Sequence, residues 1–159
     1  ILTGFKTQNA DKINAFVDKK YGIGVVFLSD DFTTAGYLNL EEMDFSFYFP
    51  NHKSYWEISK PPKLKFEKAP EFSLHNQNWS KYGLFCEQNS KIIKQYLDWF
   101  NEQGSDFSDQ SIFKINANSK NVARVTFADI DSNGLEFVLT KIDHRWVLTF
   151  IDLTSIQAE

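Results

Sequence analysis

The chain has 159 residues, which one domain with its own hydrophobic core accommodates without disulfides or metal. Its 21 acidic and 17 basic residues give a net charge of −4, and the Lys and Arg residues are scattered. This pattern argues against binding of nucleic acid or of an anionic membrane, because both need clustered positive charge. No apolar run approaches the roughly 20 residues of a transmembrane helix. We expect one α+β domain over residues 1–159, with no cofactor and no transmembrane segment.

The first expected helix lies near the start of the chain. Asn9 can cap it, and Gly22 after Tyr21 can end it in the left-handed conformation. Apolar residues recur between them at helical spacing, at Ala10, Ile13, Phe16 and Val17. Residues 24–28 are then mostly apolar and predict a short strand, and residues 29–44 are mixed and acidic, which favours a loop. Residues 45–49 alternate Phe with other residues and predict another strand.

Residues 50–89 form the least regular part, because all four prolines divide this region into short extended pieces. Residues 63–67 alternate Lys or Glu with apolar residues, which favours a charged edge strand. Ser90 is then placed to cap the strongest helix, which covers residues 91–103 and ends at Gly104. One face of this helix is apolar, at Ile93, Tyr96, Leu97 and Phe100.

The last third predicts three consecutive antiparallel strands, over residues 121–130, 135–141 and 145–153. A two-residue turn at Asp143 and His144 sets the register of the last two strands. The expected pairs are Lys141 with Trp146, Leu139 with Leu148, and Phe137 with Phe150. They predict one continuous apolar face. We expect the helices to lie across one face of this antiparallel sheet.

The polar clusters of the chain do not form a catalytic or metal-binding motif. Residues 129–136 imitate the start of a calcium loop, but the twelfth position from Asp129 is Thr140 rather than Glu, so a hairpin turn is favoured. Carboxylates at residues 30–31 and 41–44 are typical of a solvated loop. The three histidines lie in separate expected loops, without the spacing that sharing a metal requires: His52, His75 and His144.

Aromatic residues supply the candidate binding site. The chain has 16 Phe, 6 Tyr and 4 Trp, and several of them fall in the irregular middle region, where they either complete a secondary core or remain exposed as a ligand platform. If exposed, they could stack on a glycan or contact a protein. The candidate ligand-binding residues are Tyr48, Trp56, Trp79 and Tyr82. The single cysteine, Cys86, rules out an internal disulfide, and we expect it to be a small buried apolar residue.

Two stretches carry a family resemblance. Residues 79–85 read Trp-Ser-Lys-Tyr-Gly-Leu-Phe before a helix, and the ending has Trp146, Leu148 and Asp152 in a Trp-x-Leu-x-x-x-Asp strand. This combination resembles uncharacterised bacterial envelope proteins and lipoproteins. The ending also resembles SnoaL-like, cystatin-like α+β rolls, in which a helix lies in a curved sheet. That resemblance implies a cone lined by Phe137, Leu139, Leu148 and Phe150, with Asp152 either facing the pocket or, as we favour, exposed at the strand end.

These observations lead to a non-enzymatic, secreted or envelope-associated binding domain as the first hypothesis. The chain begins at Ile1 rather than Met, which indicates a trimmed or processed chain. The alternative is a small-molecule enzyme, of the isomerase or hydrolase type, that uses a cavity between helix and sheet. A third hypothesis is a module that self-associates through a sheet face.

Overall fold

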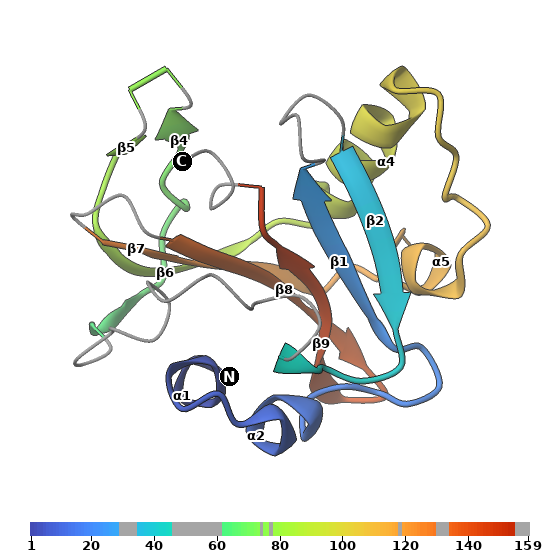
Figure 1. Ribbon diagram of the computed structural model, residues 1–159, viewed down its shortest axis with the longest axis horizontal. Helices are drawn as coiled ribbons and strands as arrows, with labels where there is room; N and C mark the ends of the chain where they lie inside the picture. The colour runs from blue at the N-terminus through green and yellow to red at the C-terminus, as the bar shows by residue number, and fades with distance from the viewer. Residues whose placement is uncertain are drawn as a thin grey trace.

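A computed structural model describes residues 1–28, 35–45, 62–73, 75–76, 78–117, 119–129 and 134–154. Within these ranges the chain forms a seven-stranded sheet in the order β2-β1-β9-β8-β7-β6-β3, together with a separate two-stranded hairpin (Figure 1). The fold therefore combines helices with a mostly antiparallel, mixed sheet. The sheet strands are β1 (Ile23–Leu28), β2 (Ala35–Leu40), β3 (Leu64–Lys65), β6 (Gly83–Gln88), β7 (Val122–Ala128), β8 (Gly134–Ile142) and β9 (Arg145–Asp152); the hairpin is β4 (Phe72–Ser73) with β5 (Asn78–Trp79).

Two pairs of neighbouring strands are parallel, which the sequence did not predict. Strand β1 pairs with β9 in parallel, and the two-residue β3 pairs in parallel with β6 at the sheet edge. The remaining neighbours are antiparallel, including β7 with β8 and β8 with β9. Strand β3 lies within the edge strand expected at residues 63–67, whereas β2 falls in a region expected to be a loop. Strand β6 falls in the region expected to be irregular.

The helices lie on both faces of the sheet, so the expectation that they cover one face was wrong (Figure 1). Helices α1 (Leu2–Lys6) and α2 (Ala10–Asn14) contribute Phe5 and Ile13 to one buried cluster. Helices α4 (Ile92–Glu102) and α5 (Ser111–Ala117) pack into the cluster on the opposite face. We call these the α1 face and the α4 face. Both faces of the central strands therefore carry a buried apolar cluster.

A shift in the pairing register of β8 and β9 determines which β9 side chains lie on each face of the sheet. Lys141 lies opposite Trp146 and Leu139 opposite Leu148, as the sequence predicts, and both turn residues Asp143 and His144 have positive φ. Beyond Leu148 the pairing shifts, so that Phe137 lies opposite Ile151 rather than Phe150. The expected pairing of Phe137 with Phe150, and with it one continuous apolar face, was wrong. Phe150 instead packs on the α4 face.

Thr149 is the additional residue of this β-bulge, and its hydroxyl is engaged on the α4 face. The oxygen lies 3.0 Å from the Thr140 hydroxyl, and it can donate to Asn116 Oδ1 at 3.3 Å. Asn116 belongs to α5 and donates in turn to the carbonyl of Ile112 at 2.6 Å. The bulge is therefore coupled to the position of α5.

Helix ends differ in part from the expected ones. Asn9 caps α2, as expected, by accepting a hydrogen bond from the Lys12 amide at 3.0 Å. That helix ends at Asn14 and does not run on toward residue 20. Before α4, the side chain of Asn89 accepts from the Lys91 amide at 3.1 Å, so Ser90 does not cap the helix. The expected strand at residues 45–49 lies almost entirely outside the described residues.

Candidate functional site

A groove with a volume of about 560 Å³ opens on the α1 face of the sheet. Its floor comes from β6, β7 and β8, and its sides come from the start of the chain, from Phe16, from the region of β3 and from the start of β9. No lining residue among those that the structure describes has a charged side chain. The lining residues are Ile1, Leu2, Thr3, Phe16, Leu64, Phe66, Leu84, Cys86, Ala123, Val125, Phe137, Leu139 and Trp146.

Helices α1 and α2 are too short to cover the whole α1 face of the sheet by themselves. Each has five residues, which corresponds to about 7.5 Å of helix, whereas seven strands side by side span roughly 30 Å. Phe5 and Ile13 fill the part of the α1 face that these helices cover, and both are fully buried. The apolar residues of β7 and β8 next to this part form the groove floor.

Large apolar side chains remain exposed around this groove. Phe16 is 42 % exposed, Leu64 38 %, Phe66 82 % and Trp146 41 %. These four come from three separate parts of the chain, since Leu64 and Phe66 are neighbours in sequence, and all of them line the groove. Only Tyr82 joins them as an exposed large hydrophobic residue in the described part of the chain. Exposed apolar side chains gathered around one concave surface are typical of a binding site.

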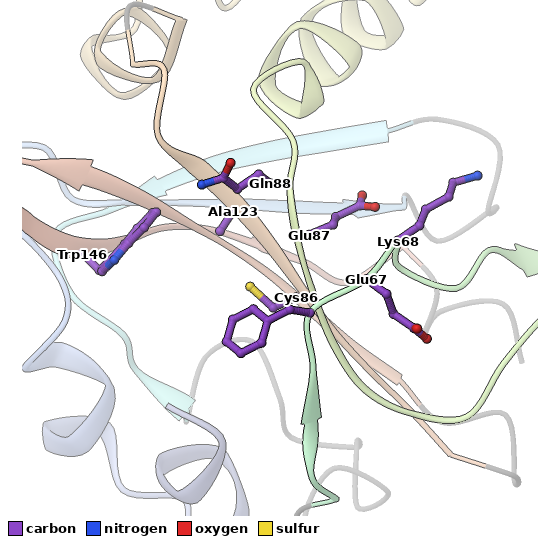
Figure 2. Close-up of a pocket in the computed structure, with 8 residues that line it drawn as sticks. Glu67, Lys68, Cys86, Glu87, Gln88, Ala123 and Trp146 are labelled. Atoms are coloured by element: carbon purple, nitrogen blue, oxygen red, sulfur yellow. The ribbon is translucent and has the colours of Figure 1, made fainter.

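A second hollow of about 480 Å³ adjoins the groove at the edge of β6. The two share four lining residues: Phe66, Cys86, Ala123 and Trp146. The second hollow adds a polar end, made of Glu67, Lys68, Glu87 and Gln88. Figure 2 shows Ala123 and Cys86 between Trp146 on one side and Glu67 and Lys68 on the other. The combined site is therefore apolar along most of its length and polar at one end.

Each charged side chain at the polar end already has a partner. Lys68 Nζ lies 2.6 Å from Glu71 Oε1, and Lys81 Nζ lies 3.4 Å from Glu67 Oε1. Glu87 accepts from the Ala69 amide at 2.9 Å through one oxygen. Its other oxygen accepts from Asn89 Nδ2 at 3.3 Å and lies 3.9 Å from Arg124 Nη1.

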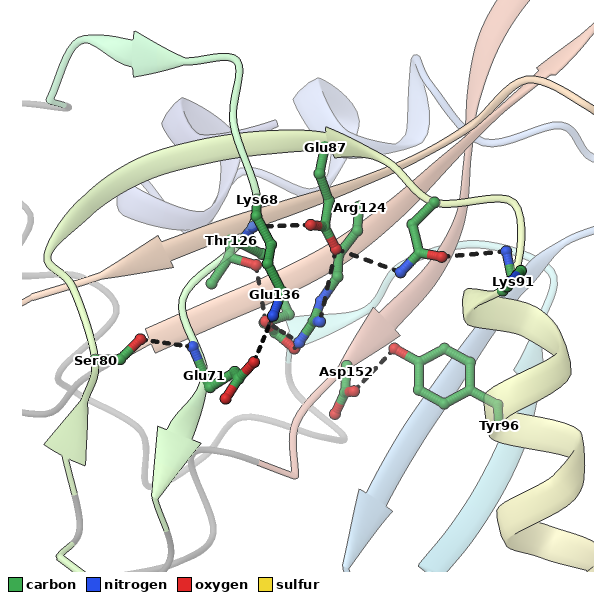
Figure 3. A network of polar contacts seen from close by, with 12 residues as sticks. Lys68, Glu71, Ser80, Glu87, Lys91, Tyr96, Arg124, Thr126, Glu136 and Asp152 are labelled. Carbon is green, nitrogen blue, oxygen red and sulfur yellow. Dashed lines mark hydrogen bonds and ion pairs between the residues drawn. The ribbon is translucent and has the colours of Figure 1, made fainter.

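A buried polar network lies behind the groove, on the α4 face (Figure 3). Arg124 Nη2 donates to both carboxylate oxygens of Glu136 at 2.6 Å, and the Thr126 hydroxyl donates to the same group at 2.7 Å. Tyr96 on α4 donates its hydroxyl to Asp152 Oδ2 at 2.8 Å. Asp152 also lies opposite Glu136 in the β8–β9 pairing. These contacts join α4 to β9 through Tyr96 and Asp152, and β7 to β8 through Arg124, Thr126 and Glu136.

Burial dominates the ionisation of this network. It raises the pKa of Glu136 above its ordinary value, the charge of Arg124 opposes that rise, and the neighbouring charge of Asp152 adds to it. Burial also raises the pKa of Tyr96 far above its ordinary value, with the charges of Asp152 and Glu136 adding to the effect. Tyr96 therefore remains a neutral hydrogen-bond donor at physiological pH.

The predicted aromatic platform is placed only in part. Tyr48 and Trp56 lie outside the described residues. Trp79 is buried and packs edge-on against Phe72, with ring centroids 5.0 Å apart. Tyr82 is exposed, and its hydroxyl donates to Asn78 Oδ1 at 3.0 Å. Neither Trp79 nor Tyr82 belongs to the described lining of the two hollows, and their ligand-binding role stays a prediction.

The cone that the family resemblance implied is also placed only in part. Phe137 and Leu139 line the groove, while Leu148 is fully buried in the same cluster. Phe150 lies on the opposite face because of the bulge. Asp152, expected to be an exposed strand end, is buried and bound to Tyr96, so that expectation was wrong.

Cys86 lines both hollows and is only partly buried, whereas the sequence predicts a buried apolar residue. Burial raises the pKa of its thiol, and the charge of Glu87 adds to the rise. His144 lies in the β8–β9 turn and is exposed, as is His75, whereas His52 lies outside the described residues. In the ranges given above, no group of three His, Cys, Asp or Glu side chains could hold a metal ion.

Sequence reasoning missed the groove because its residues are distant in the sequence. One signal was available: the alternation in residues 63–67 places Leu64 and Phe66 on the same side of an edge strand. Comparison of the chain with models of protein families, with curated proteins and with solved structures finds no match in any of the three. Among the described helices, none has the length and apolar character needed to cross a membrane.

Proposed function

We propose that this protein binds an apolar small molecule in the groove between α1 and the sheet, without transforming it. The observation that carries this proposal is the convergence of Phe16, Leu64, Phe66 and Trp146 on one groove whose described lining has no charged side chain. The groove volume of about 560 Å³ falls within the range of small-molecule sites.

The energetic reason for binding is the removal of these side chains from water. Fully burying one large apolar side chain is worth about 1.5–3 kcal/mol, and a ligand in the groove covers several such side chains in part. The floor residues are held by the packed sheet, so binding does not require ordering of the floor. A preformed apolar site of this kind supports ligand binding at modest affinity.

The groove lining supports binding rather than catalysis. Within the described lining, Cys86 is the one residue with an ionisable side chain, and its raised pKa disfavours the reactive thiolate. The carboxyl group with a raised pKa, Glu136, lies on the other face of the sheet. The enzyme alternative would need an acid or base inside the groove.

We infer that the architecture is a variant of the cystatin-like roll. The neighbouring strands β7, β8 and β9 and the groove between the first helices and the sheet support this inference. The presence of α4 and α5 on the opposite face is a departure from the expected arrangement. The secreted or envelope-associated location, and a glycan or protein as partner, stay predictions.

The proposal is tested by titrating the protein with N-phenylnaphthylamine, an uncharged apolar dye whose fluorescence rises when it leaves water. We expect saturable binding that weakens about fivefold or more in Phe66→Ser and Trp146→Ser, because each removes apolar contact area. Both side chains are exposed, so these variants should fold.

Tyr82→Ser is the matched control, since it removes an aromatic ring that is as exposed as Trp146 but lies outside the described lining of the groove. The control should bind the dye like the unaltered protein. Absence of saturable binding, or equal weakening in all three variants, would contradict the proposal.

A further inference from the structure

We infer that the ligand of this groove is an uncharged amphiphile, with an apolar body in the groove and a neutral hydrogen-bonding group at the second hollow. This inference rests on the proposed function and identifies the chemical class of its ligand. The two hollows share Phe66, Cys86, Ala123 and Trp146, so one elongated molecule can occupy both.

The apolar groove itself does not accommodate a charged group. In its described lining, the side chains able to make polar contacts are those of Thr3, Cys86 and Trp146. No side chain of this lining can form an ion pair with a charged ligand. Transfer of an unpaired charge into such surroundings is strongly unfavourable. The polar group of the ligand must therefore lie at the other end, beside Glu67, Lys68, Glu87 and Gln88.

Charges at this polar end do not complement an anion. Among the described lining residues, Glu67 and Glu87 are acidic, and they would repel a carboxylate or phosphate. The described lining also has one cation, Lys68, which contacts Glu71 at 2.6 Å. An anionic group would have to share Lys68 with Glu71 while lying beside two carboxylates.

A cationic group on the ligand would gain little binding energy at the polar end, because the carboxylates there already have partners. Glu87 already accepts from the Ala69 amide and Asn89 and lies near Arg124. Glu67 lies 3.4 Å from Lys81 Nζ. A cation would therefore compete with charges that the protein supplies, and its pairing at this partly solvated position is worth little.

Gln88 is the residue that fits a neutral polar group. It lines the second hollow, is exposed, and lies opposite Ala123 in the β6–β7 pairing, next to the floor that both hollows share. Its side-chain amide can both donate and accept a hydrogen bond, which matches a hydroxyl or an amide on the ligand.

The test compares decanol with decanoate at about pH 8, where the acid is ionised, by displacement of N-phenylnaphthylamine from the full chain. We expect decanol to bind about tenfold more tightly. Decanoate also leaves water less readily than decanol for any apolar site, so the difference between the two ligands is not sufficient as a test. The variants that change a charge at the polar end supply the test. Glu67→Gln should raise decanoate affinity about twofold to threefold, because it removes a like charge.

Lys68→Gln should change decanoate affinity by less than about twofold, and neither charge variant should change decanol affinity. Gln88→Leu should weaken decanol about fivefold, the effect of one neutral hydrogen bond, while dye binding is unchanged. Decanoate binding as tight as that of decanol, or a loss of decanoate binding of about fivefold or more in Lys68→Gln, would overturn the inference. If neither compound displaces bound dye, the inference fails while the groove remains a site for the dye. If the dye itself does not bind, the proposed function fails.

Discussion

The hydroxyl of Tyr96 on α4 donates to Asp152 at the end of β9, across 56 positions of the chain, with 2.8 Å between the two oxygens. Both residues are buried. This contact joins the helix to the strand that also contacts β1 and β8.

Removal of the Tyr96 hydroxyl should destabilise the protein. Tyr96→Phe leaves a buried acceptor on Asp152 without that donor, and we expect a loss of about 1–3 kcal/mol in the free energy of unfolding. Urea unfolding followed by circular dichroism measures it. Tyr82→Phe is the control, since its hydroxyl is exposed, and it should cost less than about 0.5 kcal/mol. Equal losses in both variants would show that the buried Tyr96–Asp152 hydrogen bond contributes no more to stability than the exposed hydroxyl of Tyr82.

Glu136→Gln should change how stability depends on pH. The pKa of Glu136 is raised in the folded protein, so its contribution to stability is fully present below its ordinary value near 4.5 and is lost as pH rises through the folded value. The unfolding free energy of the unaltered protein minus that of Glu136→Gln should therefore fall with rising pH. Urea unfolding between about pH 4 and pH 8 measures this difference.

Glu71→Gln is the control, because its effect on the free energy of unfolding should change with pH in the opposite direction. The hydrogen bond and charge of Lys68 lower the pKa of Glu71, so its contribution is present at higher pH and is lost as pH falls through the folded value. This effect should be small because the ion pair is exposed. A difference for Glu136 that rises with pH would mean that Arg124 outweighs burial.

Gly134→Ala should be destabilising because of Trp79. A Cβ at Gly134 would overlap the indole ring of Trp79, which is buried and cannot move freely. We expect a cost of about 1–3 kcal/mol in the free energy of unfolding, from overpacking. If the overlap is the cause, adding Trp79→Phe should make the double variant less destabilised than the sum of the two single variants. Additive losses would place the cause in the backbone instead.

Cys86 offers a native reporter of groove occupancy. Burial raises the pKa of its thiol, so alkylation by iodoacetamide at about pH 8 should be slower than for a free cysteine. Saturating N-phenylnaphthylamine should slow it further, since Cys86 lines both hollows. Mass spectrometry of the chain, which has one cysteine, follows the reaction. Unfolding in urea should restore the rate of a free thiol, and a rate unaffected by the dye would place the dye elsewhere.

Local patterns predicted much of the fold where the chain follows regular periods. The strands around the Asp143–His144 turn, the Asn9 cap and the apolar face of α4 each depend on residues close in the sequence. Strand β2 was missed because its place depends on pairing with β1 and on packing of Tyr37 against rings from other elements.

The candidate site could not be predicted because it depends on what the helices leave uncovered. The sequence pattern assigns Phe16 to the buried face of a helix and Trp146 to a strand next to a turn. Their exposure follows from the short length of α1 and α2 and from the position of β3 beside β6. Glu136 and Arg124 were not singled out, since their contact joins two strands across a hairpin and needs the register of β7 and β8.

The bulge at Thr149 also determines what a change of length in β9 would do to the two faces of the sheet. The side-chain alternation of β9 is out of phase on the two sides of Thr149. A substitution alters one side chain on one face, whereas deletion of Thr149 would remove the bulge and leave Phe150 opposite Val138 and Ile151 opposite Phe137 in a regular ladder. Deletion at this position would therefore keep both faces of β9 in place and remove the hydroxyl that contacts Thr140 and Asn116.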